Sequence, residues 1–154
     1  MIDSPFGFDK PEDSPGFLLW QTTVIWQRRI KKALEAYDLS HAQFVMMAIL
    51  LWFSENSTGI TPNQVLLVKQ SKLDKMTVSQ ALKKLAVEGL IERHEHQEDT
   101  RAKSVALTKK GKKLASKLVP IIEAIDAKFF NTVSRKEQKS LINILNHLIQ
   151  SANE

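Results

Sequence analysis

The feature that most limits the possible folds of this chain is a helical pattern followed at once by two short strand-like segments. Residues 73–89 (LDKMTVSQALKKLAVEG) repeat apolar residues at helical spacing, and Gly89 is placed to end the helix. Residues 90–95 (LIERHE) and 104–108 (SVALT) flank a polar turn, and the second segment alternates apolar with polar or small residues. This order predicts a helix joined directly to a β-hairpin. The apolar positions of the helix are Val78, Leu82 and Leu85.

The remaining chain is predicted to be mainly helical. Residues 1–16 hold three prolines and two glycines and are expected to form an irregular arm, with a helix beginning at Phe17. Thr108 can cap a long helix that Pro120 is expected to kink or break. Three further helix starts are predicted from capping patterns: Ser40 with Gln43, Thr61–Pro62 with Gln64, and Ser134 with Glu137.

The predicted order of elements is helix, helix, short helix, turn, helix, hairpin, helix, helix. A helix–turn–helix followed by a two-stranded hairpin is typical of a winged helix–turn–helix, so the predicted fold class is mainly α with a two-stranded β wing. The 154 residues fit one domain spanning 1–154.

Positive charge is concentrated in the middle of the chain. Residues 60–117 carry 13 Lys and Arg against 6 Asp and Glu, whereas the other residues carry 9 against 11. Such asymmetry is expected for a protein that binds a polyanion, although a solvated basic face would look the same. The longest apolar run, residues 44–53, is too short to cross a bilayer, and the first residues do not resemble a signal peptide. We therefore expect a soluble, cytoplasmic protein without membrane association.

The outward face of the helix at 73–89 is a candidate for contact with bases in a DNA major groove. Its hydroxyl and amide groups can read base edges, and its lysines can reach phosphates or guanine. No acidic residue lies between Asp74 and Glu88. This absence favours a surface that faces DNA, because carboxylates would repel phosphates. An ordinary solvated face usually carries more acids. The candidate residues are Lys75, Met76, Thr77, Ser79, Gln80 and Lys83.

The hairpin turn offers a second candidate contact. Arg101 at its tip can enter a minor groove, where the negative potential attracts a guanidinium group. Asp99 can hydrogen-bond that arginine or the local backbone, although it could equally be the first residue of a solvated turn. Candidate phosphate contacts are Lys103, Lys109, Lys110 and the backbone N–H groups near Thr61.

The segment from Asp74 to Leu114 resembles the signature region of the MarR family of bacterial transcription regulators. The family pattern D-K-x-T-V-S falls on 74–79, G-L-[IV]-x-R on 89–93, and D-x-R-x-K-x-V-x-L-T-x-x-G on 99–111. The resemblance implies a homodimer in which residues 17–37 and 109–151 form mainly dimerisation helices above two DNA-binding regions.

In such a dimer, each winged helix–turn–helix at 41–108 would bind half of a pseudo-palindromic operator. Arg101 would then lie in the minor groove with Asp99 supporting it. Family members mostly repress transcription and often release DNA when a small phenolic or anionic ligand binds.

A broad apolar stripe on the last predicted helix also suggests a dimer. It consists of Leu141, Ile142, Leu145, Leu148 and Ile149. The alternative is that this stripe packs only within its own subunit.

An aromatic set could line a cavity for a small aromatic or anionic effector, although aromatic residues at helical spacing are more often simply core. If the cavity exists, His41, Arg28 or Arg29 could meet an anionic ligand. The set comprises Trp20, Trp26, His41, Phe44 and Trp52, with Phe53 beside them.

Sensor and enzyme chemistries are mostly excluded. The chain has no cysteine, so it cannot sense oxidants through a thiol. His94 and His96 lie two residues apart near acids, but zinc would need more converging ligands, and we predict neither metal nor cofactor. No Gly-rich phosphate loop or nucleophile elbow is present.

The sequence therefore predicts a non-enzymatic, sequence-specific regulator that binds double-stranded DNA and acts as a ligand-responsive repressor. A non-specific architectural DNA-binding protein is the main alternative. A winged domain that binds a protein partner is the other.

Overall fold

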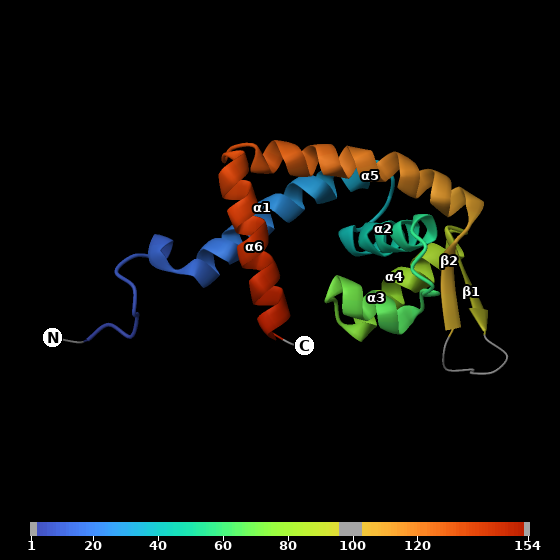
Figure 1. Ribbon diagram of the computed structural model, residues 1–154, viewed down its shortest axis with the longest axis horizontal. Coiled ribbons are helices and arrows are strands. Elements are labelled where there is room, and N and C mark those ends of the chain that lie inside the picture. The colour runs from blue at the N-terminus through green and yellow to red at the C-terminus, as the bar shows by residue number, and fades with distance from the viewer. Residues whose placement is uncertain (1–2, 96–102, 153–154) are drawn as a thin grey trace.

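The structure is a computed structural model that describes residues 3–95 and 103–152, with the side chain of Glu95 excepted. The chain is mainly helical and carries one two-stranded antiparallel sheet within these residues (Figure 1). Its elements are the 3-10 helix η1 (Pro11–Asp13), α1 (Pro15–Glu35), α2 (His41–Glu55), α3 (Gln64–Ser71), α4 (Lys75–Val87), β1 (Ile91–Glu95), β2 (Lys103–Leu107), α5 (Lys109–Phe130) and α6 (Arg135–Ala152). The predicted winged helix–turn–helix order is confirmed.

Two of the predicted capping boxes are present. At the start of α2, the Ser40 hydroxyl accepts the N–H of Gln43 at 3.1 Å, and the Gln43 side chain accepts the N–H of Ser40 at 3.0 Å. Ser134 and Glu137 make the same reciprocal pair before α6. Two interactions with Ser134 lower the pKa of the Glu137 carboxyl. The hydrogen bond with the Ser134 backbone N–H has the larger effect and that with the Ser134 hydroxyl the smaller one.

The third predicted cap is wrong, because α3 begins two residues later than the Thr61–Pro62 pattern indicates. Its N-cap is Asn63, whose side-chain oxygen accepts the N–H of Leu66 at 2.8 Å. Pro62 lies outside the helix, and its carbonyl accepts the N–H of Val105 at 2.9 Å. This pairing holds the backbone before α3 against strand β2, so those residues cannot be helical.

Two other boundaries differ from the prediction. Helix α1 begins at Pro15, because the Ser14 hydroxyl caps it by accepting the N–H of Phe17 at 3.2 Å. Helix α5 runs through Pro120 without a break. Leu118 and Ile122 are buried on either side of the proline, and this packing outweighs a local cost of about 3 kcal/mol for a proline inside a helix.

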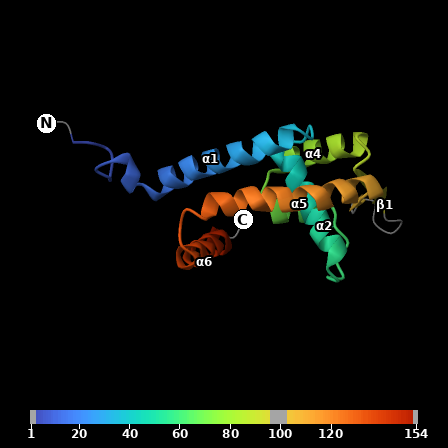
Figure 2. The same cartoon turned by 90° about the horizontal axis from the view of Figure 1, so that it is seen from above.

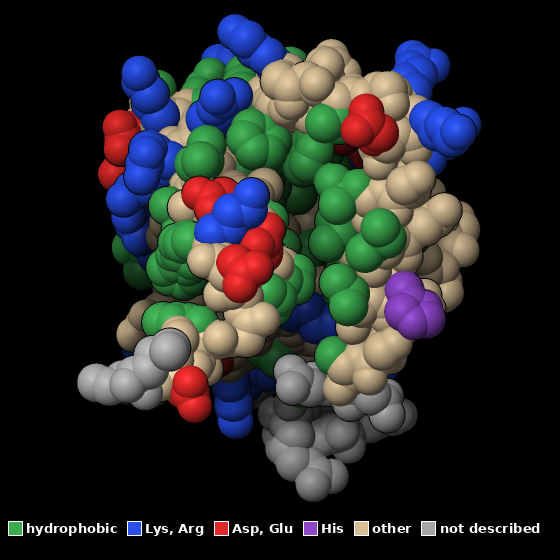
Figure 3. All heavy atoms as spheres, turned by 90° about the vertical axis from the view of Figure 1, so that its left-hand side faces the viewer, with side chains coloured by type: hydrophobic (Ala, Val, Ile, Leu, Met, Phe, Trp, Pro, Cys, Tyr) green, Lys and Arg blue, Asp and Glu red, His purple; other side chains and the backbone are tan. Residues whose placement is uncertain are grey.

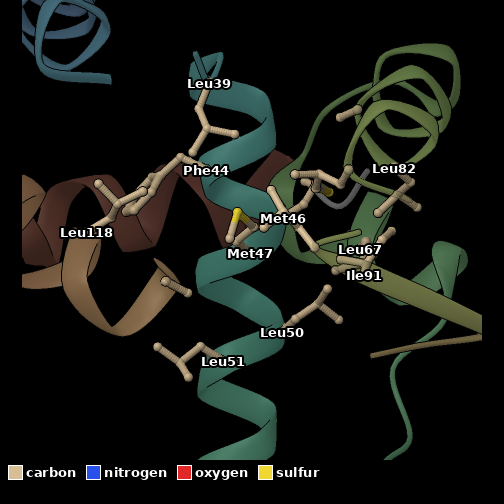
Figure 4. Packing of buried hydrophobic residues seen from close by; sticks show 14 of the residues in the cluster. Leu39, Phe44, Met46, Met47, Leu50, Leu51, Leu67, Leu82, Ile91 and Leu118 are labelled. Atoms are coloured by element: carbon tan, nitrogen blue, oxygen red, sulfur yellow. The ribbon is translucent and has the colours of Figure 1, made fainter. Parts of the chain in front are cut away.

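Helix α2 forms the centre of the hydrophobic core. It contacts α1, α3, α4, α5 and β2. Met46 and Met47 are fully buried between Leu118 of α5 on one side and Leu82 of α4 on the other (Figure 4). The apolar run that was too short for a membrane span is therefore the centre of the core, and no helix in the described ranges is long and apolar enough to cross a membrane.

Helix α6 and the N-terminal arm pack loosely on the rest of the chain. Helices α1 and α5 run side by side, whereas α6 turns away at the end of α5 (Figure 2). No residue of α6 is buried. Hydrophobic side chains are consequently spread over this end of the molecule (Figure 3).

Candidate nucleic-acid interface

Helix α4 begins at a cap that also fixes one of its candidate DNA-binding side chains. One oxygen of the Asp74 carboxylate accepts the N–H of Thr77 at 2.8 Å, and the other accepts the Thr77 hydroxyl at 2.7 Å. Both hydrogen bonds from Thr77 lower the pKa of the Asp74 carboxyl, and the one from the backbone N–H has the larger effect. The Thr77 hydroxyl therefore donates its hydrogen bond to Asp74 at the start of α4. It stabilises the helix start and does not donate this hydrogen bond to a group outside the protein.

The two sides of α4 differ sharply in exposure. Val78, Leu82 and Leu85 are fully buried, as the sequence predicted. Met76 is 70% exposed, and Val87, at the other end of the helix, is 84% exposed. Among the other candidates Lys75, Gln80 and Lys83 are exposed, whereas Thr77 and Ser79 are half-buried.

Gly89 ends α4 as predicted, in the left-handed region with φ of 72°. Its N–H donates to the carbonyl of Ala86 at 3.0 Å, and the N–H of Leu90 donates to the carbonyl of Leu85 at 2.9 Å. These two bonds form a Schellman motif, which turns the chain directly into β1.

Strands β1 and β2 form the wing. Their register pairs Ile91 with Leu107 at the base and Glu95 with Lys103 at the outer end. The buried Ser104 hydroxyl donates to the carbonyl of His94 at 3.3 Å. Asp99 and Arg101, the predicted minor-groove pair, lie outside the described residues, in the segment between the two strands.

The wing is also fastened to α5 through its N-cap. The Thr108 hydroxyl accepts the N–H of Gly111 at 3.0 Å and donates to the carbonyl of Gly89 at 2.7 Å. The N–H of Thr108 donates to the carbonyl of Leu90 at 3.1 Å. The ends of α4 and β2 and the start of α5 are thus held together at one point.

Two of the candidate lysines line the same surface hollow. It has a volume of about 390 Å³ and lies where α3, the start of α4 and strand β2 meet. It is lined by Asn63, Gln64, Val65, Val68, Lys75 and Lys103. Thr61 is exposed just before this site. The fold therefore brings candidates from the helix and from the wing onto one side of the molecule.

One predicted phosphate contact has a partner within the chain. The Lys110 ammonium donates to the carbonyl of Glu88 at 3.1 Å, close to the end of α4. A cation there stabilises the negative end of the helix dipole. Lys109, the neighbouring candidate, is exposed.

The predicted effector residues lie at different depths. The Trp26 indole N–H donates to Asp126 at 2.8 Å, and its ring meets His41 edge-on with 5.3 Å between centroids. Burial lowers the pKa of His41. Phe44 belongs to the core, whereas Trp20 and Trp52 are 67% and 54% exposed.

The remaining polar candidates are placed less favourably for ligand or metal binding. The Arg29 guanidinium stacks over the Phe129 ring, 5.1 Å from its centroid. His94 Nε2 lies 3.5 Å from a Glu92 oxygen, and both side chains are largely exposed. Of the residues that the structure describes, no three His, Cys, Asp or Glu side chains gather in a group that could hold a metal ion. His96 lies outside these residues.

Sequence reasoning missed one part of this surface, the extended segment before α3. Asn63 forms an isolated bridge to Ser104, so residues 62–63 lie beside β2. The preference of asparagine for N-cap positions could have indicated the true start of α3. The pairing with β2 joins residues about forty positions apart and leaves no local pattern.

An exposed helix without interior acids, preceded by a short helix and followed by a wing, defines a winged helix–turn–helix protein. The ArnR1-like winged-helix domain family matches residues 35–125. The chain is 36% identical over 130 residues to the uncharacterized HTH-type transcriptional regulator YdcH of Bacillus subtilis, covering 84% of this chain and 87% of that one. The protein is thus a helix–turn–helix transcriptional regulator and not an enzyme.

Solved structures share the fold over nearly the whole chain. A MarR transcriptional regulator from Methanosarcina mazei superposes with a TM-score of 0.73 at 26% identity, covering 89% of this chain and 94% of that one. Bordetella bronchiseptica BpsR, whose DNA binding is regulated by 6-hydroxynicotinic acid, gives 0.79 at 22% identity, covering 94% and 97%. The chain belongs to the MarR family of DNA-binding winged-helix regulators.

Proposed function

We propose that this protein is a homodimeric repressor that reads a pseudo-palindromic operator, with α4 of each subunit in a major groove. The observation that carries the proposal is the exposed face of α4, which presents Met76, Gln80 and Lys83 without any acidic residue between Asp74 and Glu88. Lys75 and Lys103 line the adjoining hollow, where phosphates would approach. Thr61 and Ser79 lie at the edges of this contact, and Thr77 holds the start of the helix.

The proposed dimer brings together the first and last helices of two subunits. Exposed apolar side chains occur on both, and α6 carries Ile142, Ile144, Leu148 and Ile149 at 53–57% exposure. A hollow of about 550 Å³ separates α5 from α6 and is lined by Phe130, Leu141 and Leu145 among others. A second copy seated on this stripe would remove these surfaces from water, which is the main driving force for association.

The proposed effector is a small aromatic or anionic molecule that lowers the affinity for DNA. BpsR, which has the same fold, responds to an aromatic acid. In this chain the contact of Trp26 with His41 joins α1 to α2, and the hydrogen bond to Asp126 joins α1 to α5. A ligand that inserted among Trp20, Trp26, His41, Phe44 and Trp52 would change how the dimer helices meet the DNA-binding region.

The proposed function is tested by fluorescence anisotropy at near-physiological salt. The probes are a duplex from upstream of the protein's own gene, the tightest duplex selected from a random library, and a scrambled duplex of the same length. We expect specific binding to exceed non-specific binding by about a thousandfold or more. Equal and strongly salt-dependent binding to all three duplexes would instead establish the architectural alternative.

The predicted contact of the wing with the minor groove can be tested separately in the same assay. We expect Arg101→Ala to weaken operator binding by about 1–3 kcal/mol, because it removes a guanidinium group from the minor groove. Lys109→Ala is the matched control, since a phosphate contact should weaken all duplexes alike and reduce the salt dependence. A loss below about 0.3 kcal/mol for Arg101→Ala, well under that range, would contradict the wing assignment.

A further inference from the structure

The side chains directly opposite the core on α4 form one line along the helix. Met76, Gln80, Lys83 and Val87 follow each other at spacings of four, three and four residues. Such spacing places residues on the same side of a helix. The line lies across the helix from Val78, Leu82 and Leu85, which have no exposure at all. It is therefore the part of α4 that would penetrate most deeply into a groove.

Met76 and Val87 are the two apolar residues of this line, and Met76 is the one at the N-terminal end of α4. It is 70% exposed, although a solvated polar face of a helix is ordinarily filled by charged or polar side chains. It belongs to the first turn of α4, where the helix begins at Lys75. In helix–turn–helix proteins the N-terminal residues of the recognition helix contact base edges. An apolar side chain at that place gains most by packing against an apolar group of the DNA.

The bases offer one apolar group of this kind in the major groove, the C5-methyl group of thymine. We propose that Met76 recognises a thymine in each half of the operator by packing against this methyl group. The unbranched thioether side chain can adapt its shape to the groove. This inference rests on the proposed function and adds the base that one residue of α4 selects.

The neighbouring side chains leave that role to Met76. The Thr77 hydroxyl donates to Asp74, and the Thr77 side chain is half-buried, whereas Met76 is 70% exposed and can reach further into a groove. Gln80 lies one helical turn further on and is exposed, and its amide suits adenine. One turn rises about 5.4 Å, against about 3.4 Å per base pair, so the two contacts fall on base pairs one or two steps apart.

Replacing thymine by uracil in the DNA tests the contact without altering the protein. The probe is the tightest duplex selected from a random library, with each thymine changed in turn to deoxyuridine. This change removes only the methyl group and keeps the base pairing. At one thymine in each half-site we expect affinity to fall about fourfold, the amount expected for one buried methyl-sized group. Changing both symmetric thymines should reduce it about fifteenfold, since the two sites are distant and their effects multiply.

The same scan is repeated with Met76→Ala and with Val87→Ala as the matched control. Val87 lies on the same line but at the far end of α4, and both positions are exposed enough for the variants to fold. We expect Met76→Ala to abolish the sensitivity to deoxyuridine and Val87→Ala to preserve it.

The inference would be overturned if no deoxyuridine weakens the wild-type protein, or if Met76→Ala keeps the wild-type profile. Either result would leave the proposed function intact as long as the wild-type protein still prefers the selected duplex to a scrambled one. Loss of that preference would overturn both.

Discussion

Replacing Gly111 by alanine should destabilise the protein by about 3 kcal/mol, the upper end of the usual cost of overpacking. Gly111 lies in the first turn of α5 and is buried against the turn between α4 and β1. A Cβ atom there would fall on the carbonyl oxygen of Leu90, 2.8 Å from its carbonyl carbon and 3.2 Å from Leu107 Cδ2. The clash is with backbone, so no change of rotamer can relieve it.

The surrounding hydrogen bonds prevent Leu90 from moving away. Its N–H donates to Leu85 at 2.9 Å and its carbonyl accepts the N–H of Thr108 at 3.1 Å. A shift of this backbone would weaken the Schellman motif, the α5 cap and the base of the wing together. Glycine at this position in the T-x-x-G pattern is therefore explained by close approach of two backbone segments.

Gly16→Ala provides the matched control, because nothing lies within 4 Å of a Cβ atom there. It should be neutral or stabilising by up to about 1 kcal/mol, since alanine is the better helix former. Thermal unfolding followed by circular dichroism at equal protein concentration compares the two. Gly111→Ala should lower Tm by about 6–12 °C relative to the wild type. Equal stability of the two variants would contradict the packing argument.

The sequence predicted the parts of the interface that depend on local signals. The buried side of α4, its end at Gly89 and the caps at Ser40 and Thr108 follow from spacing and from hydrogen bonds between residues at most five apart. These interactions are encoded by neighbouring residues, so a single sequence carries them.

Interactions between distant segments were not predictable in the same way. Pro62 pairs with Val105, which moves the start of α3, and Lys110 reaches back to Glu88. Pro120 remains inside α5 because residues on both sides are buried. The capping propensity at Thr61 gave the wrong start for α3, and the break that Pro120 could cause is absent, because contacts elsewhere in the fold are stronger.

The double change of Ile142→Asp with Leu148→Asp should convert the proposed dimer to a monomer. Both side chains are more than half exposed on α6, so the substitutions leave the core of the subunit unchanged. Burying an aliphatic side chain contributes about 1.5–3 kcal/mol, and a two-fold interface contains each residue twice. The four changed positions should therefore weaken association by more than about ten thousandfold.

Sedimentation velocity at micromolar protein measures the effect. The wild type should sediment as a dimer and the double variant as a folded monomer, with an unchanged circular dichroism spectrum. Ile60→Asp is the control, because Ile60 is 53% exposed but lies between α2 and α3, away from α6. It should remain a dimer.

Loss of the dimer should also change how the double variant binds DNA. A monomer reaches only one half of a pseudo-palindromic operator, so it loses the second half-site, whose binding is intramolecular in a dimer. The double variant should consequently lose its preference for the operator over the scrambled duplex, although every residue of α4 is intact. A wild-type monomer would contradict the proposed dimer, and a double variant that still dimerises would show that the dimer forms through a surface other than the apolar stripe on α6.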